Sequence, residues 1–178
     1  MKDESITNFG LLIAYVLPGF VTLFGLGEVS PAVKTWLGGG SVDSATLGGF
    51  LYVTVASVAA GLTASTFRWL VIDTLHHRTG LRPPKFDFSR LGDRVEAFDL
   101  LIEIHYRYYQ FYANTLVAGA FSYVAWRISA GGFAAALAWC DLAFVVLAPV
   151  FFAGSRDTLR RYYERSGHLL AGAGGGRD

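Results

Sequence analysis

One acidic residue, Asp141, stands alone in a long apolar stretch, and its side chain has the strongest claim to chemistry. The segment from Ile128 to Gly154 contains no other charged residue. A carboxyl group near the middle of a bilayer costs about 2.5 to 3.5 kcal/mol and faces protein or water rather than lipid. Counted inward from the end of its apolar run, Asp141 reaches the depth of four hydroxyl side chains. Together they form an expected polar layer: Asp141, Thr22, Thr54, Ser57 and Ser122.

This expected layer has a structural and a functional interpretation. Pro18 lacks the backbone N–H that would bind the carbonyl of Ala14, so a freed carbonyl is expected at the same depth. In the structural interpretation Asp141 is neutral and hydrogen-bonded within the layer. In the functional one it handles protons or cations, and a contact between subunits is a third alternative.

Acidic and histidine side chains gather near the expected inner ends of two apolar runs. They are of the types that bind zinc: Asp73, His76, His77, Glu103 and His105. Asp73 and His76 share a helix face at i, i+3, whereas Glu103 and His105, two positions apart, do not. We therefore favour interfacial hydrogen bonding over a metal site, and we assign no metal and no cofactor.

Enzyme signatures are missing from the rest of the sequence. The chain has no H-E-x-x-H zinc motif, no G-x-S-x-G nucleophile elbow, no P-loop and no dinucleotide-binding glycine pattern. The single cysteine, Cys140, excludes a disulfide framework and a cysteine-based zinc site. These observations favour a protein that is not an enzyme.

Composition indicates that a membrane surrounds these side chains. Of the 178 residues, 53% are hydrophobic and 16% are charged, whereas soluble domains carry about 25% charged residues. This balance argues against a soluble enzyme, a nucleic-acid-binding module and a disordered chain. A hydrocarbon core about 30 Å thick needs roughly 20 apolar helical residues. Four segments meet this requirement: 9–27, 45–67, 108–127 and 133–153.

The basic residues predict the orientation of these four spans. Lys and Arg near span ends remain in the cytoplasm. With both termini inside, twelve of the fifteen basic residues are cytoplasmic, Lys34 and Arg127 are outside, and Arg68 lies at the inner end of the second span. We expect a multi-pass protein of the cell inner (plasma) membrane with cytoplasmic N- and C-termini.

The connection between the second and third spans predicts a projection from the membrane. One helix can continue to about Thr79, and another can begin near Arg94. Both would extend beyond the hydrocarbon, so residues 68–107 are expected to form a cytoplasmic helical hairpin.

The expected fold class is therefore all-α, a polytopic integral membrane bundle with four transmembrane helices. Residues 1–168 form a single membrane domain that includes the hairpin. Residues 169–178, rich in glycine, are expected to form a flexible tail.

Two further patterns predict contacts with other helices or molecules. Small residues four positions apart let membrane helices approach closely, within one subunit or between copies. They are Ser57, Gly61 and Ser65 on the second span, and Ala134 and Ala138 on the fourth. Four arginines after the fourth span either enforce topology or bind anionic lipid or a partner: Arg156, Arg160, Arg161 and Arg165.

These patterns lead to two hypotheses from different classes. The first is a small non-enzymatic membrane protein that forms homo-oligomers. It either perturbs the membrane as a pore-like effector, of the kind used in bacterial stress or phage defence, or anchors a cytoplasmic protein partner. The alternative is a small transporter or membrane-embedded enzyme that uses Asp141 and the inner-face histidines. Under either hypothesis the protein contacts the lipid bilayer, and no nucleic-acid partner is expected.

Overall fold

A computed structural model describes residues 10, 12–38 and 47–171. Every regular element in this described part is helical, in agreement with the all-α prediction. The starts of the first two predicted spans and residues 172–178 of the predicted tail lie outside the described residues.

The first helical unit is interrupted near its start. A π-helical turn, η1 (Leu12–Val16), leads into α2 (Leu17–Val29), whose first turn contains Pro18. Ser30 ends α2 and caps the short helix α3 (Pro31–Leu37), because its side chain accepts a hydrogen bond from the Val33 N–H at 3.4 Å.

The second unit is helical without a break from α4 (Leu47–Arg68) through the π-helical turn η2 (Trp69–Asp73) to α5 (Thr74–Arg78). It ends one residue before the predicted boundary, at a turn in which Gly80 takes a φ of 98°. A left-handed conformation of this kind suits glycine at a helix C-terminus.

The third unit begins with two short turns, η3 (Phe88–Arg90) and η4 (Gly92–Arg94). Helical structure then continues through α6 (Val95–Leu101), the π-helical turn η5 (Ile102–Tyr106) and α7 (Arg107–Ser129). The start at Val95 agrees closely with the boundary predicted near Arg94.

The last helix, α8 (Trp139–Ala171), begins six residues later than the predicted fourth span. Gly131 and Gly132 adopt φ values of 97° and 87°, which end α7 and open an irregular connection. Ala134 and Ala138 therefore lie in this connection and not on a helical packing face. Residues 169–171, expected in the tail, belong to α8.

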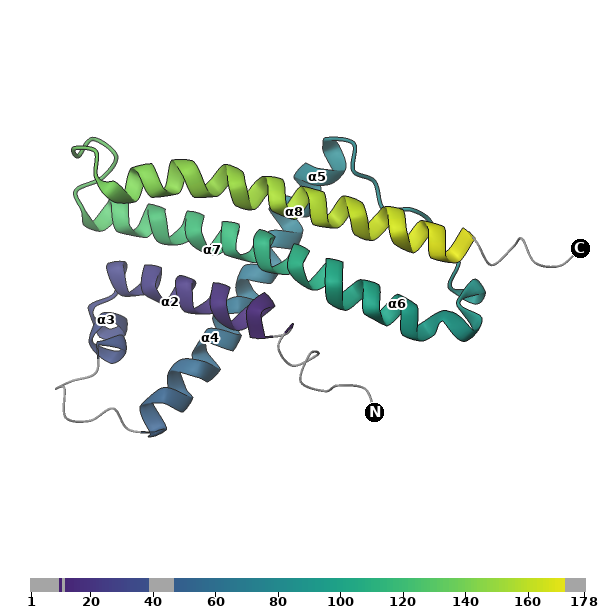
Figure 1. The fold of residues 1–178 in the computed structure, drawn as a ribbon. Helices are drawn as coiled ribbons and strands as arrows, with labels where there is room; N and C mark the ends of the chain where they lie inside the picture. The colour runs from purple at the N-terminus through teal and green to yellow at the C-terminus, as the bar shows by residue number, and fades with distance from the viewer. Residues whose placement is uncertain (1–9, 11, 39–46, 172–178) are drawn as a thin grey trace, which may run out of the picture.

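The helices form an elongated bundle in which α7 is central. Figure 1 shows α7 and α8 side by side and antiparallel, with α2 along the other side of α7 and α4 crossing the bundle obliquely. Beyond the middle of the bundle α6 continues the line of α7 and stays next to α8. This arrangement buries Tyr109 and Ala113 of α7 against Leu159 of α8.

Three helices in the described residues are long and apolar enough to cross a membrane: Leu12–Val29, Gly49–Arg78 and Trp139–Ala171. The helix of the predicted third span, α7, forms but does not meet this criterion. Polar side chains such as Gln110, Asn114 and Arg127 lower its hydropathy, and all three are buried inside the bundle.

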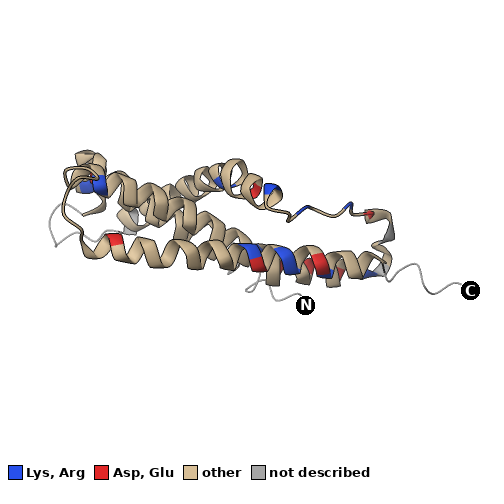
Figure 2. Ribbon diagram, turned by 90° about the horizontal axis from the view of Figure 1, so that it is seen from above, with Lys and Arg blue, Asp and Glu red and all other residues tan. Residues whose placement is uncertain are grey.

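Charge separates the bundle into two parts. The sequence of α8 has no charged residue between Asp141 and Arg156, followed by closely spaced acidic and basic residues. In Figure 2 the long helix that leads to the C-terminus shows this division by its colours. We call residues 155–171 the polar half of α8, and we call this half together with α6 and η5 the polar end. The polar half of α8 packs against α6 and η5. The predicted hairpin of the second and third helices is not confirmed, and α6 and η5 instead pack against α8.

Aromatic side chains hold the polar end together. Phe86, from the connection after α5, contacts Phe98 of α6 and Tyr162 of α8, with ring centroids 6.4 and 6.3 Å apart. Tyr106 of η5 lies 5.2 Å from the Tyr162 ring. Edge and tilted contacts at such distances each stabilise a cluster by about 0.5 to 1.5 kcal/mol.

Candidate functional site

Asp141 lies in the first turn of α8, where three groups bind its carboxylate. The Ala138 backbone N–H donates to Oδ2 at 2.7 Å, and the Tyr123 hydroxyl donates to Oδ1 at 2.8 Å. The Arg127 Nε lies 2.9 Å from Oδ1, and both partners of this ion pair are buried. Asp141 therefore caps the N-terminus of α8 and joins it to the end of α7.

The carboxylate binds a hydroxyl of another helix, as expected from sequence, but it does not lie in the middle of a helical span. Asp141 is near a helix end because the Gly131-Gly132 break delays the start of α8. Arg127 also reaches the carbonyls of Ala135 and Ala136, at 3.4 and 3.3 Å. An arginine and an aspartate on either side of two glycines are the sequence signal for this pair.

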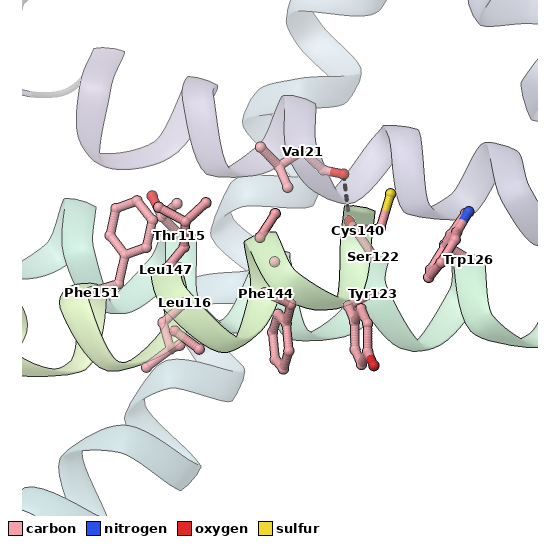
Figure 3. A pocket seen from close by; sticks show the side chains of 13 residues that line it. Val21, Thr115, Leu116, Ser122, Tyr123, Trp126, Cys140, Phe144, Leu147 and Phe151 are labelled. Carbon is pink, nitrogen blue, oxygen red and sulfur yellow. Dashed lines mark hydrogen bonds between the residues drawn. The ribbon is translucent and has the colours of Figure 1, made fainter. Parts of the chain in front are cut away.

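The four hydroxyl residues do not assemble with Asp141 into one polar layer. Ser122 donates to the Val21 carbonyl of α2 at 2.7 Å, as Figure 3 shows. The other three donate to the carbonyl four residues earlier in their own helix, at 3.0, 2.9 and 2.8 Å: Thr22, Thr54 and Ser57. A hydroxyl satisfied in this way needs no partner on another helix.

Asn114 of α7 binds the freed backbone carbonyl that was expected to lie at the depth of the polar layer. Pro18 leaves the Ala14 carbonyl without its usual helical donor, and the Asn114 Nδ2 donates to that carbonyl at 2.8 Å. Both residues are fully buried. The freed carbonyl is predictable from Pro18, but its partner lies 100 positions away in the chain and carries no local signal.

A line of polar contacts continues from Asn114 along α7 toward the polar end. One turn away, the Gln110 Nε2 donates to the Tyr15 hydroxyl at 2.9 Å, and Arg107 donates to the Gln110 Oε1 at 3.2 Å. Arg107 in turn lies 3.7 Å from Glu103. These side chains face η1, so the irregular start of the first helix is held by α7.

Glycines bring α4 and the first helix into backbone contact. A Cβ at Gly61 would lie 2.0 Å from the Tyr15 carbonyl oxygen, and one at Gly19 would lie 1.7 Å from the Ser57 carbonyl oxygen. Close approach of this kind is typical of small-residue packing in membranes. The run through Ser57, Gly61 and Ser65 is therefore used within one chain, the first of the two alternatives open from sequence.

Near the opposite end of α4, Arg68 and Asp73 join the second unit to α7. The Arg68 Nη1 lies 3.5 Å from the Asp73 Oδ1, and the Tyr109 hydroxyl donates to the same carboxylate oxygen. The Arg68 guanidinium also lies 5.1 Å from the centroid of the Tyr109 ring. Arg68, expected at the inner end of the second span, is only 6% exposed.

His76 joins α5 to the polar half of α8. Its Nε2 lies 3.0 Å from the Ser155 Oγ, and Ser155 donates its own proton to the Phe152 carbonyl at 2.8 Å. The serine oxygen must therefore accept the bond, so His76 carries its proton on Nε2. His76 and Ser155 are fully buried, which leaves no space for a substrate at this pair.

His105 joins η5 to the polar half of α8 in the same manner. The Arg165 Nη1 donates to the His105 Nε2 at 2.8 Å. Burial lowers the pKa of His105 below its usual value, and the positive charges of Arg165 and Arg161 lower it further, against an opposite effect of Asp157.

The five residues considered for a metal each have another partner or lie apart. Glu103 pairs with Arg107, Asp73 with Arg68, His76 with Ser155 and His105 with Arg165. His77 is only partly buried on α5. Within the described residues no three histidine, cysteine or acidic side chains are placed to hold a metal ion.

The four arginines of the polar half do not form one free basic stripe. Arg156 donates to the Thr79 hydroxyl and carbonyl at 2.5 and 2.9 Å, and so caps α5. Arg165 binds His105. Arg160 and Arg161 pair with acidic neighbours on the exposed face of α8, at 3.5 Å to Glu164 and 2.9 Å to Asp157.

An apolar groove of about 370 Å³ separates α2 from α8 over the surface of α7. Figure 3 shows Phe144 of α8 stacked on Tyr123 of α7, with ring centroids 4.2 Å apart, and Cys140 at the same groove. Apart from the Cys140 thiol, the side chains that line the groove are apolar or carry only hydroxyl and indole groups.

Among the described residues, several buried polar pairs join helices. Each pair lies where two units meet: Asp141 with Arg127, Asn114 with Ala14, and His76 with Ser155. Compared with known proteins, the chain matches no family, no curated protein and no solved structure.

Proposed function

We propose that this chain is a small, non-enzymatic integral membrane protein that presents its polar end in the cytoplasm as an anchor for a partner. The division of α8 is the observation that carries this proposal. Its first half exposes apolar side chains such as Leu142, Val145 and Val150, at 53, 65 and 57%. Its second half exposes ion pairs, with Arg160 61% and Glu164 59% exposed. Lipid suits the first surface and water the second.

A four-span topology with both termini in the cytoplasm follows if α7 also crosses. Two of the candidate spans cover α7, since α2 and α8 pack on it. Its polar side chains Gln110 and Asn114 face inward, whereas Phe121 and Ile128 are exposed. Polar groups that bind one another inside a bundle are compatible with a membrane span.

Self-association belongs to the same proposal but needs a surface other than the Ser57–Gly61–Ser65 run. Gly61 contacts η1 within the chain, so it is not available to a second copy. The exposed apolar faces of α4 and α8 remain for homo-oligomer contacts in the membrane.

A second candidate function is membrane perturbation, and the polar line inside the bundle favours it. The side chains of Arg107, Gln110 and Asn114 extend from the polar end into the apolar part. A rearranged oligomer could expose this line to water. The transporter or enzyme alternative has less support, because Asp141 is ion-paired and His76 is enclosed.

Two measurements in cells separate these functions. Photo-crosslinkers at the exposed positions Leu100 and Glu164 should give a discrete adduct with another protein if the polar end binds a partner. A crosslinker at Val146 should give no adduct other than one between two copies of this chain. Overproduction should leave the membrane potential unchanged. Depolarisation that Asn114→Leu abolishes, without an adduct at the polar end, would replace the anchor by the pore.

A further inference from the structure

The polar half of α8 is fastened by two histidines that belong to different elements. His76 of α5 binds Ser155, the first residue of the polar half. His105 of η5 binds Arg165, which lies further along the same helix. Both histidines are buried, at 0 and 7% exposure. Both sites depend on the charge state of the imidazole: the His105 hydrogen bond needs an unprotonated Nε2, and the buried Nδ1 of His76 has no partner for an added proton among the described residues.

At His76 the geometry fits only a neutral ring. Ser155 uses its proton on the Phe152 carbonyl, so the Nε2 of His76 is the donor. The Nδ1 is buried, and nothing in the described part of the chain hydrogen-bonds to it. A second proton would therefore place an unsatisfied N–H and a positive charge in a closed site.

At His105 the geometry also requires a neutral ring. The Arg165 guanidinium has only donors, so the His105 Nε2 that faces it must offer a lone pair. A proton on this nitrogen replaces the hydrogen bond by two opposed donors and two like charges. Protonation thus converts an attraction between η5 and α8 into a repulsion.

The other charged groups around the two rings add to this effect. Arg156 of α8 faces His76 and disfavours its protonation, as does the adjacent His77, while Asp73 of η2 has the opposite effect but already binds Arg68 and Tyr109. Around His105, Arg165 and Arg161 of α8 outweigh Asp157.

We propose that the polar half of α8 is a proton-sensitive arm, which stays docked on α5 and η5 at neutral pH and loosens when His76 and His105 become protonated. This inference adds a mode of regulation to the proposed function, because the arm is half of the surface offered to a partner. It concerns contacts within one chain, so it does not depend on the topology or on the partner.

Hydrogen exchange on the purified full-length protein in detergent micelles tests the proposal. Exchange of amides 155–171, corrected for the intrinsic effect of pH, should accelerate at least about tenfold between pH 7.5 and 5.0. A tenfold change in the opening equilibrium of the arm corresponds to about 1.36 kcal/mol. Amides 113–125 of α7 serve as the internal reference and should keep their protection.

The four histidines of the chain supply a matched control. In the double variant His76→Gln and His105→Gln, the amide groups can keep both hydrogen bonds but cannot gain a proton, so the acceleration should disappear. The variant His77→Gln and His168→Gln removes the two less buried rings and should behave like the natural protein.

Three results would overturn the proposal. Equal protection of amides 155–171 at both pH values in the natural protein is the first, and it needs no variant. Acid acceleration that persists in the His76 and His105 double variant is the second. If the double variant does not fold, the single variant His105→Gln is measured instead. An acid acceleration equal to that of the natural protein would show that His105 does not loosen the arm, and this is the third result that overturns the proposal. The anchor function can fail separately, since it is measured by crosslinking in cells.

Discussion

A methyl group added at Gly61 should push the second helical unit away from the first. The added Cβ of Gly61→Ala would lie 2.0 Å from the Tyr15 carbonyl oxygen and 2.8 Å from its carbon. Ordinary contact begins at 3.4 Å. Since both groups are backbone atoms, no side-chain rotation relieves the clash, and α4 must move by more than an ångström.

The size of the effect follows from two opposing contributions. Overpacking a closely packed contact costs about 1 to 3 kcal/mol. Replacing glycine by alanine in a helix with free space instead stabilises it by up to about 1 kcal/mol. Gly119 of α7 supplies that second case, because a Cβ there would meet nothing within 4 Å. Because the helix-propensity gain is common to both variants, we expect Gly61→Ala to be less stable than Gly119→Ala by the overpacking cost alone, about 1 to 3 kcal/mol.

Unfolding in mixed micelles, followed by helicity and tryptophan fluorescence as the denaturing detergent increases, measures this difference. Gly61→Ala should unfold at a lower detergent fraction than the natural protein, and Gly119→Ala at an equal or higher one. If the two variants unfold at the same point, α4 does not cross the first helix at Gly61, and the packing described above is wrong.

Three other changes test the buried polar contacts. Asn114→Leu should lower the unfolding free energy by about 1 to 3 kcal/mol because the Ala14 carbonyl loses its donor, and a variant as stable as the natural protein in the same micelle assay would argue against this bond. Asp141→Asn should lower the unfolding free energy because it leaves the buried Arg127 charge uncompensated. Adding Arg127→Gln should restore part of this loss. An Asp141→Asn variant as stable as the natural protein would instead favour a neutral aspartate. Because the pKa of His105 is lower in the folded than in the unfolded chain, the unfolded chain binds more protons than the folded one as pH falls. The unfolding free energy should therefore decrease as pH falls from about 7 through 6.5. A micelle unfolding midpoint that rises over this range would contradict the prediction.

The sequence was informative wherever a local signal decides the structure. The helix end near Thr79 and the helix start near Arg94 agree with the structure within one residue. Local signals such as Gly80 act over a few positions. Pro18 frees the Ala14 carbonyl for the same local reason. Composition also indicates membrane association, and three helices are long and apolar enough for it.

The sequence was less informative wherever distant segments must find one another. Periodicity on α7 cannot reveal that Asn114 binds Ala14, 100 positions earlier, or that α6 packs on α8 and not on the second helix. The depth of Asp141 was misjudged because counting from an apolar boundary assumed a continuous helix, whereas Gly131 and Gly132 interrupt it. The candidate metal residues failed to converge because nearer partners, such as Arg107 for Glu103, engage them first.

Cysteine accessibility along α8 tests the central proposal, a helix that passes from lipid into the cytoplasm, most directly. Single cysteines at Leu142, Val146, Arg160 and Glu164, each with Cys140→Ser, would be treated with a membrane-impermeant maleimide in intact cells and in inverted membrane vesicles. We predict labelling of positions 160 and 164 in the vesicles only, and of positions 142 and 146 in neither preparation. Labelling of Val146→Cys in the vesicles, or of Glu164→Cys from outside intact cells, would contradict this account.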